Sequence, residues 1–568
     1  MTTTGTARGS AAKRAPGTVA VRAPRTGAPR TGARTTTGAP RTGARTTPRT
    51  PTQRTPGPRT PGGGTRGGTR GGAKTAPEID TKTAHRSVEE RTATGKRARD
   101  AAPLAGHSGW SPAAGRPDPV AVLERQDRDR EPDLVPIRHG RMMASPFTFY
   151  RGAAAVMAAD LKDTPVAGLD VQLCGDAHLL NFGVFASPER LLLFDVNDFD
   201  ETLPGPFEYD LKRLAASLTI AGRTNGFSGQ DARASAAAAV TAYREAMAEF
   251  AQMRTMDIWY ARLSERELLA AGRGVVRADV AEAKTAKGAK AKKAKKQAKA
   301  ARKAEKLAGR TAEKAYGHNS LQALAKLSEV VDGRHQIASQ PPVLVPAREL
   351  AATYGLSAED TARTIGDQLH AYRATLPDDR RHLLDRFEVV DVARKVVGVG
   401  SVGTRDYIVL LQGRDTSDPL FLQIKEATAS VYEPYLGKSR HRQHGERVVQ
   451  GQRMMQAASD IFLGWTRGLD ARRHFYWRQL RDMKGTPQVE SMGPVALSFY
   501  ARICGWTLAR AHARSGDPVA IAAYLGGSGA FDTSIADFAV RYADQNEQDY
   551  AEFVRAIRSG RLQAIEGI

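Results

Sequence analysis

The stretch Leu173-Cys174-Gly175-Asp176-Ala177-His178-Leu179-Leu180-Asn181-Phe182-Gly183, followed by Leu192-Leu193-Phe194-Asp195, decides the fold that we expect. Residues 171–173 predict a short strand that runs into a loop over 174–181. Residues 182–185 and 191–194 predict two more strands, and Ser187-Pro188-Glu189-Arg190 between them has the composition and length of a hairpin turn. The loop is therefore expected to lead directly into a β-hairpin.

This hairpin is expected to bring polar side chains together at its open end. Asn181 comes just before the first strand and Asp195 just after its partner, and paired strands lie about 5 Å apart. A carboxamide and a carboxylate that leave room for water and phosphate suit Mg²⁺. Asp176 lies on the same loop and is placed to accept a proton from a nucleophile that attacks a metal-bound phosphate. Asp and Asn are also common turn residues, which is the alternative for each of them taken singly.

The positive charge of the chain is concentrated in two segments. The whole chain carries a formal charge of +23, residues 1–100 hold 21 Lys or Arg against 5 Asp or Glu, and residues 284–314 hold 13 against 2. The remaining residues are therefore slightly acidic. The overall charge does not make the whole protein a nucleic-acid binder.

Both basic segments are expected to lie outside the core. Residues 1–115 repeat Pro-Arg-Thr-Gly-Ala and then become Gly-rich, which predicts a disordered tail. Such a tail holds RNA, DNA or anionic lipid weakly, or only improves solubility. The Lys/Ala block over 284–314 predicts an isolated polar helix that extends from the surface, because we find no apolar stripe in it.

Cysteine content and hydropathy indicate the compartment. Cys174 and Cys504 are the only cysteines, too few for a disulfide framework. No apolar run approaches the ~20 residues that span a bilayer. We expect a cytoplasmic protein without a transmembrane segment.

A Gly-rich segment forms a second group of candidate residues. Gly398, Gly400 and Gly403 lie between strands expected over 387–397 and 407–411. This setting lets backbone N–H groups fold over phosphates, whereas a Rossmann site needs a helix after the glycines. A third strand, over 420–424, ends at Lys425, and a lysine there needs a partner. We expect Glu446, at the start of a helix over 446–463, to pair with it, with Glu433 as the alternative.

Several of these motifs resemble those of phosphotransferases. Gly175 to Asn181 looks like the catalytic loop H-G-D-x-H-x-x-N of aminoglycoside and choline phosphotransferases, with Cys174 in place of the first His. Gly205 to Leu211 is similar to their G-D-P-x-x-D-L motif, whose second Asp, here Asp210, braces the loop. Residues 422–425 are similar to the V-A-I-K strand of kinases.

The resemblance implies a role for each residue. Asp176 would be the base, Asn181 and Asp195 would hold Mg²⁺, and Glu446 would orient the lysine. The ATP triphosphate would be held by Gly398, Gly400, Gly403 and Lys425. Asp198, Asp200 and Glu201 either include a second Mg²⁺ ligand or form a solvated acidic loop, and His178 is expected to brace the loop by hydrogen bonds.

The order of the motifs is reversed relative to kinases, since the Gly-rich segment follows the catalytic loop by more than 200 residues. We therefore expect an α+β, kinase-like, two-lobed fold that is circularly permuted, the alternative being that one group is coincidental. Residues 505–513 resemble the L-A-x-L-H-A helix that precedes the catalytic loop in aminoglycoside kinases, a role for which a helix over 153–161 competes. The expected segments are a disordered basic tail over 1–115, a catalytic-loop lobe over 136–283, a Lys/Ala-rich insertion over 284–314, a helical connection over 315–386, a small lobe with the Gly-rich loop and lysine over 387–485, and C-terminal helices over 486–568.

Residues 136–560 resemble the bacterial family called domain of unknown function 2252. The stretches that carry this resemblance are Ser145-Pro146-Phe147, Cys174 to Gly183, Asp195 to Glu201, Gln479-Leu480-Arg481-Asp482 and Tyr542-Ala543-Asp544-Gln545. The motifs together predict an ATP- and Mg²⁺-dependent phosphotransferase that acts on an unidentified small molecule or protein. The alternatives are a nucleotide-sensing protein with a nucleic-acid-docking basic tail and an AMP transferase.

Overall fold

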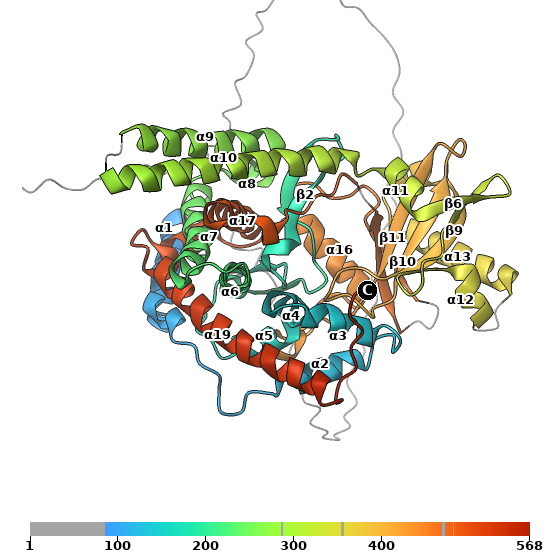
Figure 1. Cartoon of the computed structure of the whole chain (residues 1–568), viewed down its shortest axis with the longest axis horizontal. Coiled ribbons are helices and arrows are strands. Elements are labelled where there is room, and N and C mark those ends of the chain that lie inside the picture. Colours follow the sequence, from blue (N-terminus) through green and yellow to red (C-terminus); the bar gives the residue numbers. More distant parts are fainter. Residues whose placement is uncertain (1–85, 286–287, 354–356, 469–471, 481) are drawn as a thin grey trace, which may run out of the picture. The chain divides into compact units, whose positions relative to one another are not determined.

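Helices and strands are mixed along the chain in the computed structural model, which describes residues 86–568 except 286–287, 354–356, 469–471 and 481 (Figure 1). The helical part is built around α6 (Phe207–Thr224), α7 (Gly229–Phe250), α17 (Pro494–Ser515) and α19 (Ala530–Arg558). These helices pack against one another, and the apolar side chains between them form the largest hydrophobic core of the described residues. α17 and α19 lie in the segment 486–568, where we expected helices.

The predicted loop and hairpin lie beside this helical part. β1 (Asp170–Leu173) pairs with β4 (Leu203–Pro206), and β2 (Phe182–Ala186) pairs with β3 (Leu192–Val196). The short β5 (Leu263–Ser264) extends the hairpin to three strands. The hairpin and the strand before the loop are therefore confirmed.

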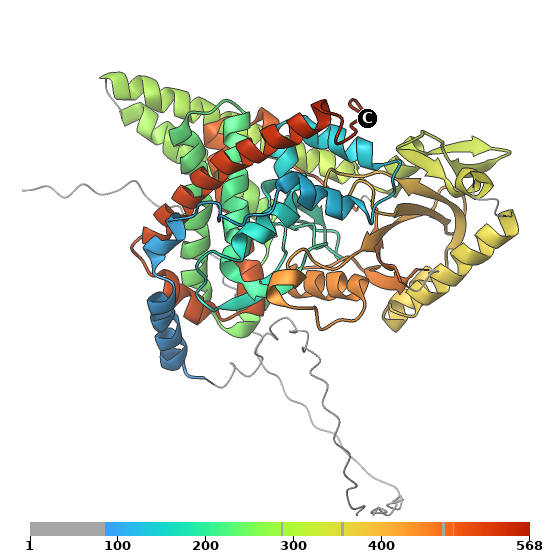
Figure 2. The ribbon, with the colours of Figure 1, turned by 90° about the horizontal axis from the view of Figure 1, so that it is seen from below.

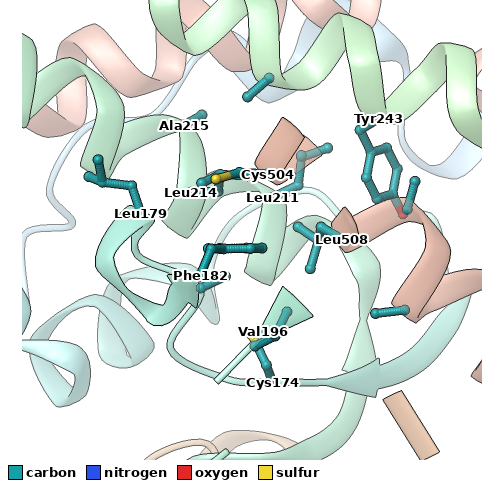
Figure 3. Close-up of a cluster of buried hydrophobic side chains, with 14 of the residues drawn as sticks. Cys174, Leu179, Phe182, Val196, Leu211, Leu214, Ala215, Tyr243, Cys504 and Leu508 are labelled. Atoms are coloured by element: carbon teal, nitrogen blue, oxygen red, sulfur yellow. The ribbon is translucent and has the colours of Figure 1, made fainter. Parts of the chain in front are cut away.

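Behind the loop, Leu179 and Phe182 join the core side chains of α6 and α17. Figure 3 shows these two residues close to Leu211 and Leu214 of α6 and to Cys504 and Leu508 of α17. Leu179 and Phe182 are fully buried. The loop is thus fixed from behind by apolar packing, which leaves its polar residues on the other side.

The second part of the protein is a six-stranded antiparallel sheet in the order β12-β13-β11-β10-β9-β8. Alternate residues of β10 (Asp406–Gln412) enter two separate cores. Ile408 and Leu410 pack towards α11 (Ser320–Leu327), while Val409 and Leu411 pack towards α13 (Ala358–Arg373). Both faces are therefore covered, as the nearly unbroken apolar run of this strand requires. The other strands are β8 (Leu344–Pro346), β9 (Glu388–Lys395), β11 (Pro419–Ala427), β12 (Gly464–Arg467) and β13 (His474–Gln479).

The remaining elements connect these two parts. α16 (His444–Met455) packs against β11, β12 and β13 and is seen beside the sheet in Figure 2. This helix is shorter than the segment expected over 446–463, since residues 456–463 are not helical. The others are α2 (Pro119–Asp127), α3 (Val135–Met143), α4 (Pro146–Gly152), α5 (Ala154–Leu161), α8 (Thr255–Tyr260), β6 (Ser328–Val331), β7 (Arg334–Ile337), α12 (Ala347–Thr353), α14 (Asp378–Leu384), α15 (Glu433–Leu436), α18 (Pro518–Leu525) and the 3₁₀ turns Leu104–Ser108, Leu179–Asn181 and Val489–Ser491.

The boundary expected for the N-terminal tail is wrong. Residues 1–85 lie outside the described residues, but α1 (Val88–Ala101) is a helix with a complete capping box formed by Ser87 and Glu90. It packs against α18, and Arg91 forms an ion pair with Asp517. The apolar content of this stretch is low, so its docking depends on close backbone contact and on ion pairs.

The expectation of an isolated helix without an apolar face over 284–314 is also wrong. α10 (Gly288–Gly317) lies alongside α9 (Glu265–Thr285), as Figure 1 shows. Among the α10 side chains that the structure describes, the buried ones are Ala294, Ala298, Ala301, Ala312 and Ala315. An alanine stripe at helical spacing therefore takes the place of large apolar residues and lets the two helices approach closely.

The structure also shows the state of the two cysteines and the length and hydropathy of the described helices. Cys174 and Cys504 are both free and buried. Among the described residues, no helix is both long and apolar enough to cross a membrane.

Candidate functional site

The start of the loop over 174–181 is held in place by Asp210 of α6. The Asp210 carboxylate accepts hydrogen bonds from the backbone N–H groups of Cys174 (2.8 Å) and Gly175 (3.0 Å). Gly175 has φ +85°, and a Cβ at this position would lie 2.2 Å from the carbonyl oxygen of Glu201. Only glycine fits there. The expectation that Asp210 braces the loop is confirmed.

Asp176 carries the carboxylate of the loop, and its pKa is shifted. Its Oδ1 accepts a hydrogen bond of 2.8 Å from Nε of Arg213, one turn beyond Asp210 on α6, and its side chain remains 19% exposed. Burial raises the pKa of Asp176 to about 6, and Asp198 adds to the rise, whereas Arg213 opposes it. A carboxylate with such a pKa is ionised at neutral pH and is still basic enough to take a proton.

Asn181 uses one end of its amide to hold the loop. Its Nδ2 donates to the carbonyl oxygen of Asp176 (2.8 Å), whereas its Oδ1 makes no hydrogen bond within the part of the chain that the structure describes. His178 braces the same turn, as expected, because its Nδ1 accepts from the backbone N–H of Leu180. The free oxygen of Asn181 is thus available for a ligand.

Asp195 does not join these residues. Its side chain is fully buried, its Oδ1 accepts from Arg510 and from its own neighbour Val196, and its Oδ2 accepts from the backbone N–H of Ala457. The expected pairing of Asp195 with Asn181 at a metal site is therefore not found. In the hairpin register Asp195 lies opposite Gly183, and its carboxylate joins β3 to α17 and to the segment after α16.

The acids that follow Asp195 occupy the position in which we expected Asp195. Asp198 and Asp200 lie beyond the end of β3, where the chain leaves the hairpin. The Asp200 carboxylate binds Nζ of Lys425 (2.5 Å) and the hydroxyl of Tyr476 (2.6 Å). Asp198 accepts only the backbone N–H of Asp200 among the described residues. Asp198 thus has fewer partners within the described residues than Asp200.

Lys425 is a buried cation at the end of β11. Burial alone would lower the pKa of Lys425, but Asp198 and Asp200 outweigh it and raise this pKa well above its ordinary value. The prediction that Glu446 pairs with Lys425 is wrong, because Glu446 contacts His441 (3.4 Å) and Asp200 holds the lysine. The alternative, Glu433, contacts His444 instead.

The Gly-rich loop joins β9 to β10 as a hairpin. Gly398 and Gly403 have φ values of +68° and +90°. Three carbonyl oxygens of the loop are bound from the segment before α4: Arg141 binds that of Gly398, Arg130 that of Val402, and the Glu131 N–H that of Gly403. The backbone N–H groups of Gly400 and Ser401 donate to no described residue. The loop is therefore fixed through its acceptors while two donors stay free.

One cavity of about 640 Å³ brings the two groups together. Asp176, Asn181 and Asp198 line it from the side of segment 174–198, and Gly398 and Gly400 line it from the side of the six-stranded sheet. Asp200 also lines the cavity. Gly403 does not, and neither does Lys425, which is bound to Asp200. Segments more than 200 residues apart in the sequence thus face the same space.

Three further residues lie in the cavity wall or beside the residues that line it. Arg213 follows Asp210 by three residues, so helical periodicity places both on one face of α6, and this spacing was the available signal. Arg151 lines the cavity, and its Nε is buried without a hydrogen-bond partner among the described residues. Asp406 is buried beside Lys425 in the strand register, and burial raises its pKa to about 7. No sequence signal distinguishes Asp406 from a surface strand residue.

A dedicated metal cage is not found. Within the described ranges, no three His, Cys, Asp or Glu side chains come close enough to hold a metal ion. Magnesium sites that include substrate phosphates use only one or two protein ligands and do not need such a cluster.

Fold and cavity together define a mixed helix-and-strand protein with an acid-lined polar site. The family model described as an uncharacterized protein conserved in bacteria (DUF2252) matches residues 130–301 and 279–556. The chain belongs to this family. No curated protein and no solved structure matches the sequence.

Proposed function

We propose that this protein is an ATP- and Mg²⁺-dependent phosphotransferase that acts on a small molecule or a protein. The observation that carries the proposal is the shared cavity, into which the loop residues Asp176, Asn181 and Asp198 and the Gly-rich hairpin loop both face. A base, oxygen ligands and free backbone donors in one space are the parts that phosphoryl transfer needs.

The donor groups present fit a magnesium ion bound together with a nucleotide. Asn181 Oδ1 and the Asp198 carboxylate are hard oxygen donors, both line the cavity, and neither is used up by the protein. The metal would neutralise charge on the phosphates when it is bound. We assign the ligand role to Asp198 and not to Asp195, because Arg510 and two backbone N–H groups already occupy the Asp195 carboxylate.

The sheet side of the cavity fits a polyphosphate. The free N–H groups of Gly400 and Ser401 are donors for phosphate oxygens, and no side chain at Gly400 obstructs the approach. Lys425 supplies a fixed positive charge beside Asp200. Its pairing with Asp200 places the lysine close to the acids without leaving it exposed.

Asp176 would take the proton from the acceptor hydroxyl. Arg213 orients the carboxylate through its Nε, and the loop backbone is held by Asp210. Transfer of AMP by the same residues with the nucleotide reversed remains the alternative reaction.

We further propose that the arrangement is a permuted form of the kinase-like fold. Two contacts between distant segments support this proposal. His512, within the segment that resembles the helix before a phosphotransferase catalytic loop, lies 3.2 Å from Asp210, and Ser515 accepts from the backbone N–H of Gln172 in β1. The end of α17 is therefore beside the start of the loop although the chain order is reversed.

The test is a comparison of full-length wild type with Asp176→Asn and Asp198→Asn. Each protein is incubated with Mg-ATP and a metabolite extract, and ADP formation and labelled phosphate in products are followed, with intact mass for self-modification. We expect transfer by wild type, a loss of at least about 100-fold in both variants, and unchanged nucleotide binding in Asp176→Asn. Glu329→Gln, an exposed acid on β6, is the matched control and should behave as wild type.

Two results would contradict the proposal. Binding of Mg-ATP without any hydrolysis or transfer would favour the nucleotide-sensing alternative. Absence of nucleotide binding would show that the shared cavity serves another ligand.

A further inference from the structure

Opposite its alanine stripe, α10 presents a continuous stripe of positive charge. The stripe consists of Lys292, Lys296, Lys299, Lys303, Lys306, Arg310 and Lys314, and every one of these side chains is exposed. Their spacing of three or four residues places all seven within about 80° of the helix circumference at 3.6 residues per turn. They cover about 33 Å at 1.5 Å per residue.

Nothing in the described part of the protein neutralises this stripe. None of the seven residues forms an ion pair with a described residue, and no acidic residue lies within the stripe. Of the two acids on α10, Glu305 falls on the side of the buried alanines by helical periodicity, whereas the exposed Glu313 lies just outside the edge of the stripe, near Arg310 and Lys314. Packing of the alanines against α9 fixes the orientation of the helix, so the cations are held on one side.

We propose that this stripe binds the phosphate backbone of a nucleic-acid duplex without sequence preference. Sequence-independent binding needs a row of Lys and Arg along the backbone, and a 33 Å stripe extends for about one turn of a duplex. A membrane surface is disfavoured, because helices that lie on membranes insert large apolar side chains. Among the α10 side chains that the structure describes, the buried ones are alanines, and the large side chain of Tyr316 lies outside the stripe and donates a hydrogen bond to Glu265 of α9. This inference does not depend on the proposed phosphotransferase activity.

The test uses the full chain, so that the basic residues 1–85 are present in every sample. The variant K296Q/K299Q/K303Q/K306Q removes four charges, and glutamine has nearly the same helix propensity as lysine. The matched control K96Q/R97Q/K326Q/R334Q removes four exposed charges elsewhere. Binding to a 30-base-pair DNA duplex and to an RNA duplex of the same length is measured from 50 to 300 mM KCl.

We expect the α10 variant to lose about tenfold or more in affinity at 0.1 M salt, and the slope of log K against log salt to fall by about 3 to 4. The control should change neither by more than about one third of that amount. The two duplexes show whether DNA or RNA is preferred. The variant K303A/R310A/K314A, with alanine as the best helix former, provides a second substitution set if the first unfolds.

Two outcomes would overturn the inference. One is equal salt slopes for the α10 variant and the control. The other is binding to phosphatidylserine vesicles that is stronger than binding to either duplex and that depends on the same four lysines.

Discussion

At the residue scale, Asp176 is distinguished by its ionisation. Burial raises the pKa of its carboxyl group to about 6 despite the Arg213 contact. Below that pH the carboxyl group is protonated and cannot act as a base, and above it the carboxylate is available. We therefore expect the rate of phosphate transfer to rise with pH, reach half its maximum near pH 6, and fall about tenfold per pH unit below this value.

A pH–rate profile with saturating Mg-ATP measures this, with nucleotide affinity followed in parallel. Glu201 also has a pKa raised by burial, to about 7, so Glu201→Gln is the control and should keep the midpoint near 6. A wild-type rate that is constant from pH 5 to 8 would exclude Asp176 as the base.

Asp195 and Asp198 are three residues apart and differ in what holds them. Asp195→Asn leaves the buried Arg510 without its anionic partner, and breaking such a pair costs on the order of 3–5 kcal/mol. Asp198→Asn removes a carboxylate that has only one backbone partner, so we expect a small effect on stability and the loss of Mg²⁺-dependent activity. Urea unfolding and transfer assays on both variants measure the difference. Equal loss of stability in the two variants would contradict this assignment.

At the scale of elements, α1 depends on a glycine for its docking. A Cβ at Gly95 would lie 2.0 Å from the carbonyl oxygen of Ala520 in α18. In an undocked helix, Gly→Ala stabilises by up to about 1 kcal/mol, whereas in a tight contact it costs about 1–3 kcal/mol. We expect Gly95→Ala to destabilise the protein and, because undocked α1 unfolds more readily, to speed trypsin cleavage after the exposed Lys96 and Arg97.

Urea unfolding and limited trypsin digestion measure these effects. Gly115→Ala is the control, because no atom lies within 4 Å of the added Cβ. Stabilisation by Gly95→Ala would mean that α1 is undocked in solution.

The sequence predicts those elements whose own residues show a clear local pattern. Strong periodicity and turn residues identify the 182–194 hairpin, the Gly-rich hairpin and the long helices. α1 and the pairing of α10 with α9 are missed, because glycine and alanine contacts give little hydropathy signal. For the site, motif spacing singles out Asp176, Asn181, Gly398 and Gly400, which line the cavity, and also Gly403, which does not. The sequence does not reveal that Asp198 lines the cavity and Asp195 does not. Every residue of β3 is buried, so an alternation of buried and exposed residues could not indicate which acid faces the cavity.

At the scale of the whole molecule, the cavity is made by two segments that are distant in sequence. If Mg-ATP binds there, it contacts both, so ligand binding should slow amide hydrogen exchange in 398–404 and in 176–181 together. At 100 times the dissociation constant the stabilisation is about 2.7 kcal/mol, which limits the slowing to about 100-fold.

Hydrogen exchange followed by mass spectrometry, with and without Mg-ATP, measures this protection. Peptides of the β6–β7 hairpin line no part of the cavity and should not change. If Asp198 holds a metal ion together with the nucleotide, as proposed, Asp198→Asn should reduce the protection of both segments. Protection of the Gly-rich loop alone would mean that the nucleotide does not reach Asp176, and the catalytic role of the loop would then have to be abandoned even though the nucleotide binds.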